Sequence, residues 1–136
     1  MKITTKQKQQ IKKIAEKYHL RFIIIHGSYA RGEEREGSDL DVAVYENERI
    51  DYSKLFEMRR DFSTIFGDNE DRELDLKTLY DKDPLFVYQV VRDSQLIYGK
   101  KYDYCFFEAA TIRNYFFNSK IFKLEDILIK KALQNL

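Results

Sequence analysis

Along the first third of the chain, the spacing of apolar residues changes from one typical of a helix to one typical of strands. Apolar residues recur at helical spacing through residues 5–19, with lysine and glutamine between them, which predicts an amphipathic helix. Residues 22–25 are continuously apolar and mostly β-branched, and Gly27 follows, so we expect a strand buried on both faces. Residues 39–44 place a large apolar side chain at every second position, which predicts a second strand. A polar, glycine-containing loop joins the two strands.

The pattern after residue 50 predicts further helices and strands in turn. The predicted elements are a helix at residues 52–66, a strand at about 72–79, a helix at 84–92 and a short strand or extended segment at 95–99. Gly67 is suited to end the first of these helices, because glycine is a favoured C-cap residue. Asp83 and Pro84 are expected at the N-cap and the first position of the second helix, where proline loses no hydrogen bond.

The C-terminal region from Asp103 onward is predicted to be helical, either continuous or interrupted near Asn118. Its many aromatic residues at helical spacing are typical of a core, and a partner surface is the alternative. Cys105, the only cysteine, stands in an aromatic stretch without a second cysteine or a nearby histidine to complete a site. We therefore interpret it as a buried core thiol.

The order of elements predicts an α+β domain in which a small mixed sheet is flanked by helices and followed by a helical tail. The 43% apolar content is enough for one core, so we expect a single domain over residues 1–136, with its core at about 10–98 and its tail at about 103–136. Lys and Arg (24) nearly cancel Asp and Glu (23), so direct nucleic-acid binding is not expected. No apolar run approaches a membrane span and the N-terminus lacks a signal-like segment, which favours a soluble, cytoplasmic protein.

The loop after the first predicted strand has the features of a phosphate-binding turn. At Gly27 the backbone carries no side chain, so it can come close to a triphosphate. The backbone N–H groups of the turn and the Ser28 hydroxyl can then bind phosphate oxygens.

Three aspartates are candidates for binding metal ions. Asp39 and Asp41 are two residues apart on a predicted strand, so both side chains point to one face. Asp75, on the third strand, reaches that face if its strand is a neighbour of the second. Carboxylate oxygens are the ligands that Mg²⁺ prefers, and three of them fit a site for two ions that steady the attacking and leaving oxygens of a phosphoryl-group transfer.

In these residues the sequence resembles the nucleotidyltransferases of the DNA polymerase beta superfamily. Their pattern consists of Gly-Ser, an Asp-x-Asp pair that follows after ten intervening residues, and a single Asp further along the chain. Gly27-Ser28, Asp39 with Asp41, and Asp75 match this pattern, and the resemblance covers about residues 10–98. The length and the Ala-Arg-Gly sequence at 30–32 are most similar to the minimal nucleotidyltransferases, the antitoxins of HEPN toxin–antitoxin pairs. The resemblance implies transfer of AMP from ATP to a tyrosine hydroxyl of a HEPN ribonuclease toxin, within a hetero-oligomer with that toxin.

The resemblance also implies residue roles. Asp39 and Asp41 would bind both Mg²⁺ ions and Asp75 the catalytic one, while Gly27 and Ser28 would hold the triphosphate. Two further residues, Arg31 and Ser38, are added as nucleotide-binding candidates, although Arg31 could instead brace the loop by pairing with a carboxylate. One departure is His26, where the family often has an apolar or aromatic residue; we interpret it as a neutral, hydrogen-bonded residue at the strand end, with a role at the acceptor site as the alternative.

Two other functions fit parts of the pattern. Small-molecule nucleotidyltransferases, such as the aminoglycoside- and lincosamide-modifying enzymes, share the catalytic residues but usually carry a larger acceptor-binding region. A non-catalytic module that blocks a toxin by contact alone would have no use for clustered carboxylates, which repel each other. Protein adenylylation is therefore the leading hypothesis.

Overall fold

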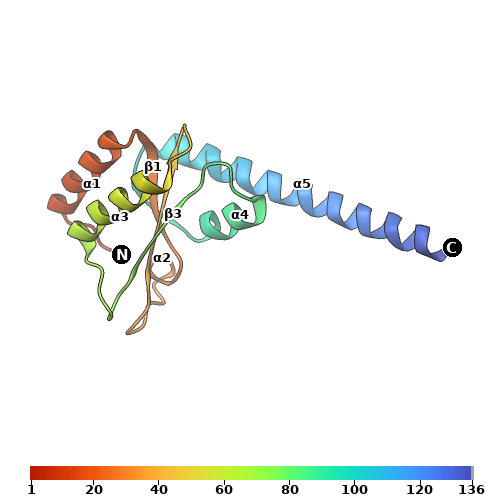
Figure 1. Cartoon of the computed structure of the whole chain (residues 1–136), viewed down its shortest axis with the longest axis horizontal. Coiled ribbons are helices and arrows are strands. Elements are labelled where there is room, and N and C mark those ends of the chain that lie inside the picture. Colours follow the sequence, from red (N-terminus) through yellow and green to blue (C-terminus); the bar gives the residue numbers. More distant parts are fainter. Residues whose placement is uncertain (136) are drawn as a thin grey trace.

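The computed structural model describes residues 1–135 as a layered body from which one long helix extends (Figure 1). The elements in chain order are α1 (Thr5–Lys17), β1 (Leu20–His26), α2 (Ser28–Arg31), β2 (Leu40–Glu46), α3 (Tyr52–Phe66), β3 (Leu74–Thr78), α4 (Pro84–Arg92), β4 (Gln95–Tyr98) and α5 (Lys101–Gln134). The helices and strands expected from the hydrophobic pattern are all present, with ends that differ from the predictions by a few residues.

The strands form one mixed sheet in the order β3-β2-β1-β4. β1 pairs antiparallel with both β2 and β4, whereas β2 and β3 run parallel. Helix α3 makes the crossover between the two parallel strands. This small mixed sheet with its flanking helices confirms the predicted fold class.

Hydrophobic side chains fill both faces of the sheet. On one face Ile23 and Val42 are fully buried in a cluster with residues of α1 and α3. On the other face Ile24 and Ala43 are fully buried in a cluster with Val87 and other residues of α4 and the start of α5. The continuous apolar run in β1 thus reflects a strand covered on both sides, as predicted.

Local signals place the ends of the helices. The Asp83 side chain accepts hydrogen bonds from Leu85 N and Phe86 N, which caps α4 at the predicted position. Gly67 ends α3 with a φ of 82°, as expected for glycine at this position. The start of α4 and the end of α3 therefore lie where the sequence predicts them.

Helix α5 runs without interruption from Lys101 to Gln134, so the alternative of a break near Asn118 is excluded. Its first part packs on α4 and the sheet, and its second half projects away from the body (Figure 1). Cys105 is exposed, which shows that the predicted buried thiol is wrong. The reason is the helix phase: Tyr104 faces the core, and the next residue points about 100° further round the helix.

Across residues 1–135, none of the helices combines the length and the apolar character that crossing a bilayer requires.

Candidate active site

Three polar side chains lie in one row across three strands at one end of the sheet. His26 on β1 is the register partner of Asp41 on β2, and Asp41 is the register partner of Asp75 on β3. Side chains directly opposite each other on paired strands share a face, and here it is the face that α4 and α5 cover, because Ala43, two residues after Asp41, packs there. The parallel pairing of β2 with β3 therefore brings Asp75 beside Asp41. Asp39 lies just before β2 and is exposed.

The turn at Gly27 packs directly on the Asp41 carboxylate. Gly27 has a φ of 71° and a ψ of −150°, a conformation that L side chains rarely adopt. A Cβ at this position would overlap Asp41 Oδ2. Ser28 then opens the single helical turn α2, which ends at Gly32. The backbone of the turn thus lies directly against an acidic side chain, and any side chain at residue 27 would collide with that carboxylate.

The charges in the row are only partly balanced. Burial, followed by the neighbouring Asp75 carboxylate, raises the pKa of Asp41, and Lys77 works in the opposite direction. Lys77 Nζ lies 3.1 Å from Asp75 Oδ2, and the ammonium group also stands 5.8 Å from the centre of the Phe86 ring. One lysine therefore lies near two neighbouring carboxylates, so its single positive charge does not neutralise both of them.

His26 is buried at the end of β1 and is neutral at physiological pH. Burial lowers the pKa of its imidazole to about 4, with the positive charge of Lys77 acting in the same direction. This agrees with the prediction of a neutral histidine. The predicted hydrogen bond is not found at Nε2, which is buried and has no partner within residues 1–135.

Of the two remaining nucleotide-binding candidates, Arg31 is the last residue of α2 and Ser38 lies in the loop that follows. Arg31 Nε donates to Glu33 Oε2 at 3.0 Å, which is the bracing alternative considered from the sequence. Ser38 Oγ accepts a hydrogen bond from Arg35 N at 2.9 Å, so it stabilises the turn that leads into Asp39. Contacts of Arg31 and Ser38 with a nucleotide stay predictions.

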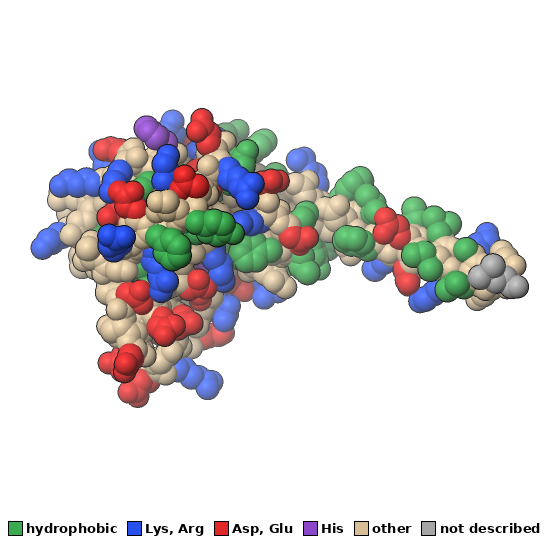
Figure 2. Space-filling model, viewed as in Figure 1, with side chains coloured by type: hydrophobic (Ala, Val, Ile, Leu, Met, Phe, Trp, Pro, Cys, Tyr) green, Lys and Arg blue, Asp and Glu red, His purple; other side chains and the backbone are tan. Residues whose placement is uncertain are grey.

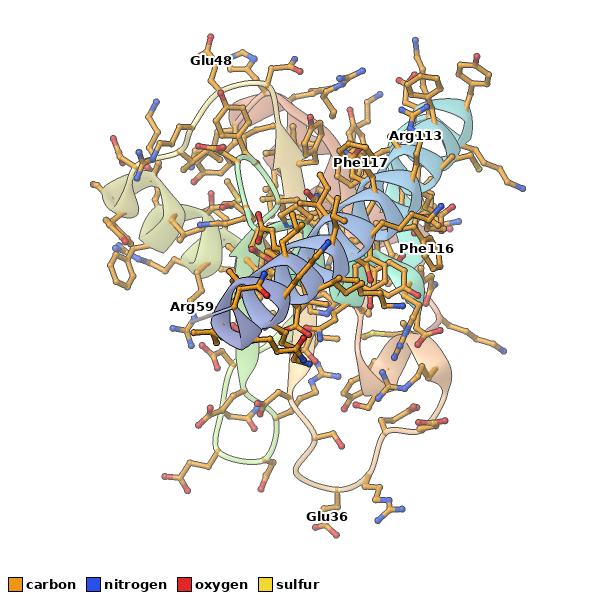
Figure 3. The ribbon with its side chains drawn as sticks, turned by 90° about the vertical axis from the view of Figure 1, so that its right-hand side faces the viewer. Glu36, Glu48, Arg59, Arg113, Phe116 and Phe117 are labelled. Carbon is orange, nitrogen blue, oxygen red and sulfur yellow. The ribbon has the colours of Figure 1, made fainter. Side chains whose placement is uncertain are left out.

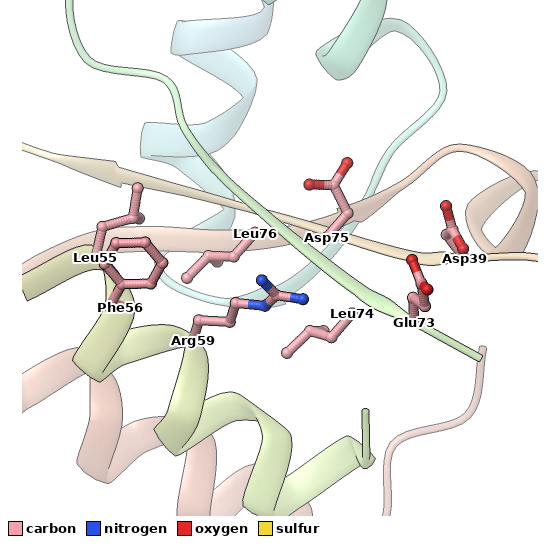
Figure 4. Close-up of a pocket in the computed structure, with 8 residues that line it drawn as sticks. All are labelled: Asp39, Leu55, Phe56, Arg59, Glu73, Leu74, Asp75 and Leu76. Atoms are coloured by element: carbon pink, nitrogen blue, oxygen red, sulfur yellow. The ribbon is translucent and has the colours of Figure 1, made fainter. Parts of the chain in front are cut away.

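A cleft of about 230 Å³ lies between α3 and the β3 edge of the sheet (Figure 4). Asp39, Glu73 and Asp75 contribute to its lining, together with apolar residues and Arg59 of α3. Figure 4 shows Asp75 and Arg59 on opposite sides of the β3 ribbon. The cleft therefore lies mainly on the opposite face of the sheet from the row of His26, Asp41 and Asp75. The sequence analysis did not identify Arg59 as a cleft residue, because Arg59 belongs to no recognisable motif. Lys77 was missed as well, although its spacing of two from Asp75 on a strand signals a shared face.

The donor chemistry of the site fits a hard divalent cation. Asp41 and Asp75 are adjacent, they offer carboxylate oxygens, and their charges are only partly met by Lys77. In the described part of the chain, no group of three His, Cys, Asp or Glu side chains is already arranged closely enough to hold an ion. Asp39 would have to turn toward the other two, which its exposed position before β2 leaves room to do.

Known proteins share this arrangement of sequence and fold. Residues 9–103, more than half of the chain, match the family described as Polymerase beta, Nucleotidyltransferase. The chain belongs to this family. The resemblance inferred from Gly27, Ser28 and the aspartates is thereby confirmed.

Curated relatives come from Methanocaldococcus jannaschii. The candidate protein adenylyltransferase MJ1215 is 46% identical over 56 residues, which are 41% of this chain and 62% of the relative. A second one, MJ0128, is 44% identical over 54 residues, which are 40% of this chain and 55% of the relative. The matched segment thus spans less than two thirds of either relative.

Solved structures show the same fold. A chain from the crystal structure of a toxin-antitoxin with AMP-PNP superposes with a TM-score of 0.69 at 23% identity, covering 89% of this chain and 98% of that one. A chain from the tri-AMPylated Shewanella oneidensis HEPN toxin in complex with MNT antitoxin gives 0.65 at 21% identity, covering 93% and 99%. The Enterococcus faecialis spectinomycin adenyltransferase AAD(9), with ATP and spectinomycin, gives 0.52 at 18% identity, covering 72% and 57%.

Proposed function

We propose that this nucleotidyltransferase transfers AMP from ATP to a tyrosine hydroxyl of a HEPN ribonuclease toxin and thereby acts as its antitoxin. The observation that supports this most is the placement of Asp41, which is paired in register with Asp75 and packed on the backbone turn at Gly27. An acidic pair packed against a glycine-containing backbone turn is suited to a reaction at a nucleotide α-phosphorus.

In this proposal each residue has a defined task. The backbone of Gly27 and the hydroxyl of Ser28 bind the triphosphate oxygens, and Asp39, Asp41 and Asp75 hold two Mg²⁺ ions. When bound, the ions would neutralise the departing pyrophosphate and acidify the acceptor hydroxyl. Asp75 accepts the proton of that hydroxyl. The acceptor oxygen bonds to the α-phosphorus as the bond from the α-phosphorus to the bridging oxygen breaks, which releases pyrophosphate.

The comparisons support the proposal in two respects. The matched relatives are named for protein adenylylation, and the family model spans the segment of this chain that holds the motif. The superposed complexes contain toxin–antitoxin partners, and the match extends over about nine tenths of this chain. The spectinomycin enzyme covers less of this chain and is itself longer than the part that matches, so a protein acceptor is favoured over a small molecule.

Intact-mass measurement tests the proposal. The chain is incubated with ATP, Mg²⁺ and the product of the adjacent reading frame, and we expect an AMP-sized mass gain on that product. The gain should vanish with Asp41→Asn and persist with Asp71→Asn, a matched control at an exposed aspartate outside the row. Complex formation without a mass gain would indicate a binding module instead. A gain on an aminoglycoside or lincosamide, with none on the protein, would indicate a small-molecule enzyme.

A further inference from the structure

The projecting half of α5 exposes large apolar side chains to solvent. Every residue from 120 to 135 is exposed, and Figure 2 shows hydrophobic side chains gathered along this part of the helix. A first stripe consists of Phe117, Ile121, Leu124 and Leu128, with exposed fractions between 38% and 63%. A second stripe consists of Phe122, Ile129 and Leu133, with exposed fractions between 59% and 68%. We refer to the two stripes together as the distal surface.

The two stripes lie on different sides of the helix. At 100° per residue, the spacings of four, three and four in the first stripe keep its members together, and the second stripe lies about 120° further round. Figure 3, which looks toward the C-terminal end of α5, shows how the consecutive residues Phe116 and Phe117 diverge from the helix. Apolar side chains thus cover two of the three sides of the projecting half.

The second stripe continues a line of residues that is packed where α5 crosses the body. Tyr104 and Thr111, both 7% exposed, are followed along this line by Tyr115, whose ring stacks on Tyr88 with centroids 4.1 Å apart. Phe122 comes one heptad after Tyr115, and Ile129 one heptad after that. The sequence pattern of a packed helix therefore extends past the point where, among residues 1–135, this chain supplies anything to pack against.

A hollow marks the place where α5 leaves the body. It has a volume of about 490 Å³ and lies between the start of α4, at Pro84 and Leu85, and the middle of α5, at Tyr115 and Phe122. Leu85 is 48% exposed and Phe122 is 68% exposed. The hollow and the second stripe therefore form one continuous apolar surface made by two helices.

The third side of the projecting half carries four lysines around one apolar residue, Ile127, which is 60% exposed. Lys120, Lys123, Lys130 and Lys131 lie on it, and of these Lys130 pairs with Asp126 at 2.9 Å. The seven apolar residues of the distal surface expose on the order of 700 Å² in all, close to the ~800 Å² that each partner contributes to a stable complex. Such a surface fits a partner with an apolar groove and an acidic rim along one side.

We propose that the distal surface docks an all-helical protein, which receives α5 in an apolar groove formed by at least two helices and bordered by acidic residues. This inference rests on the proposed function, because the partner meant is the toxin that receives AMP. A second copy of this chain, paired through a two-helix coiled coil, would cover the first stripe and leave the second in water. A groove between two helices covers both.

Substitutions within each stripe test the inference with the full chain. The double variant Leu128→Asp/Ile129→Asp places one charge in each stripe, and Lys13→Asp on the exposed side of α1 is the control. Because both replaced residues are exposed in the free chain, its thermal midpoint and helical circular dichroism should stay close to those of the wild type. Binding to the product of the adjacent reading frame is then measured by calorimetry.

We expect the double variant to bind at least roughly a hundredfold more weakly than the wild type, as for two central interface residues, and the control to bind normally. Lys130→Glu/Lys131→Glu should weaken binding less, and the loss should shrink at high salt. In the transfer assay, the double variant should raise the KM for the toxin and keep the wild-type kcat at saturating toxin.

The inference would be overturned if the double variant bound the toxin as well as the wild type does, or if the wild type did not bind the toxin at all. It would also be overturned if the free chain formed a dimer that the double variant dissociates while toxin binding persists. Cosedimentation of the wild type with anionic phosphatidylserine vesicles instead of toxin binding would overturn it as well. The two proposals fail in distinguishable ways. If docking is lost in the variant and no AMP is transferred even by the wild type, the docking surface stands and the catalytic proposal falls. If AMP transfer is normal in both, the reverse holds.

Discussion

Glu46 is a buried acidic residue whose ionisation should make the stability of the fold depend on pH. It ends β2 on the face covered by α1 and α3, is 2% exposed, and neither carboxylate oxygen has a hydrogen-bond partner within the described chain. Burial raises the pKa of Glu46 to about 7, and its own backbone N–H and, less strongly, Lys82 oppose the rise. A carboxylate without partners is poorly solvated in this position, so the folded state favours the protonated form.

The sign and size of the effect follow from proton linkage. Between the ordinary pKa of 4.5 and the folded value of about 7, the native chain keeps a proton that the unfolded chain has released. Stability is therefore highest below pH 4.5 as far as this group is concerned, and it falls as the pH rises through that window. At 1.36 kcal/mol per pKa unit, the loss approaches about 3 kcal/mol by pH 8.

Urea unfolding of the wild type and of Glu46→Gln at pH 5 and pH 8 measures this loss. Glutamine has a similar shape and no charge, so the variant should lack the destabilisation and be the more stable protein at pH 8. Taking the difference between the two proteins at each pH removes the contribution of every other titrating group, His26 included. Glu48→Gln, at an exposed neighbour, is the control and should show no pH-dependent difference. If the Glu46→Gln difference is the same at both pH values, Glu46 is already charged or paired in the native protein and the reasoning is refuted.

Three further outcomes are expected. Gly27→Ala combines an unfavourable φ with overlap onto Asp41, so it should abolish nucleotide binding by calorimetry and lower the free energy of unfolding by about 1–2 kcal/mol; normal binding would show that the turn can relax. Asp83→Ala removes the side-chain cap of α4 and should cost about 1 kcal/mol in urea unfolding, whereas Asp71→Ala, at an exposed aspartate that caps no helix, should cost much less. Cys105 should react fully with a thiol reagent in the native state, and protection until unfolding would contradict its exposed position.

The sequence was most informative where the physical signal is local. Helix ends followed from capping chemistry, as at Asp83 and Gly67, because a cap depends on a few consecutive residues. The strand period placed the side chain of Asp41 correctly relative to Val42. The prediction that Asp75 reaches Asp41 is conditional, because it requires β3 to pair with β2. The sequences of the two strands do not show which strand pairs with which. The parallel register between them supplies that missing condition.

Features that depend on distant packing were harder to predict. Cys105 was assigned to the core from its aromatic neighbours, but the phase of α5 turns Tyr104 inward and Cys105 outward. The aromatic residues of the tail raised the same ambiguity between core and surface, because an apolar helix face looks alike in sequence whether its cover comes from the same chain or from another molecule. Glu46 gave no signal at all, since a glutamate at the end of a strand is normally exposed.

The contact between residue 27 and the carboxylate on the adjoining strand makes the length of that acid matter as much as its charge. Replacing Asp41 by glutamate keeps the negative charge and adds one methylene group in a space that already excludes a single carbon atom. The longer side chain has to push the turn aside or swing out of the row. Conservative exchange of one acid for another is therefore a disruptive change at this position.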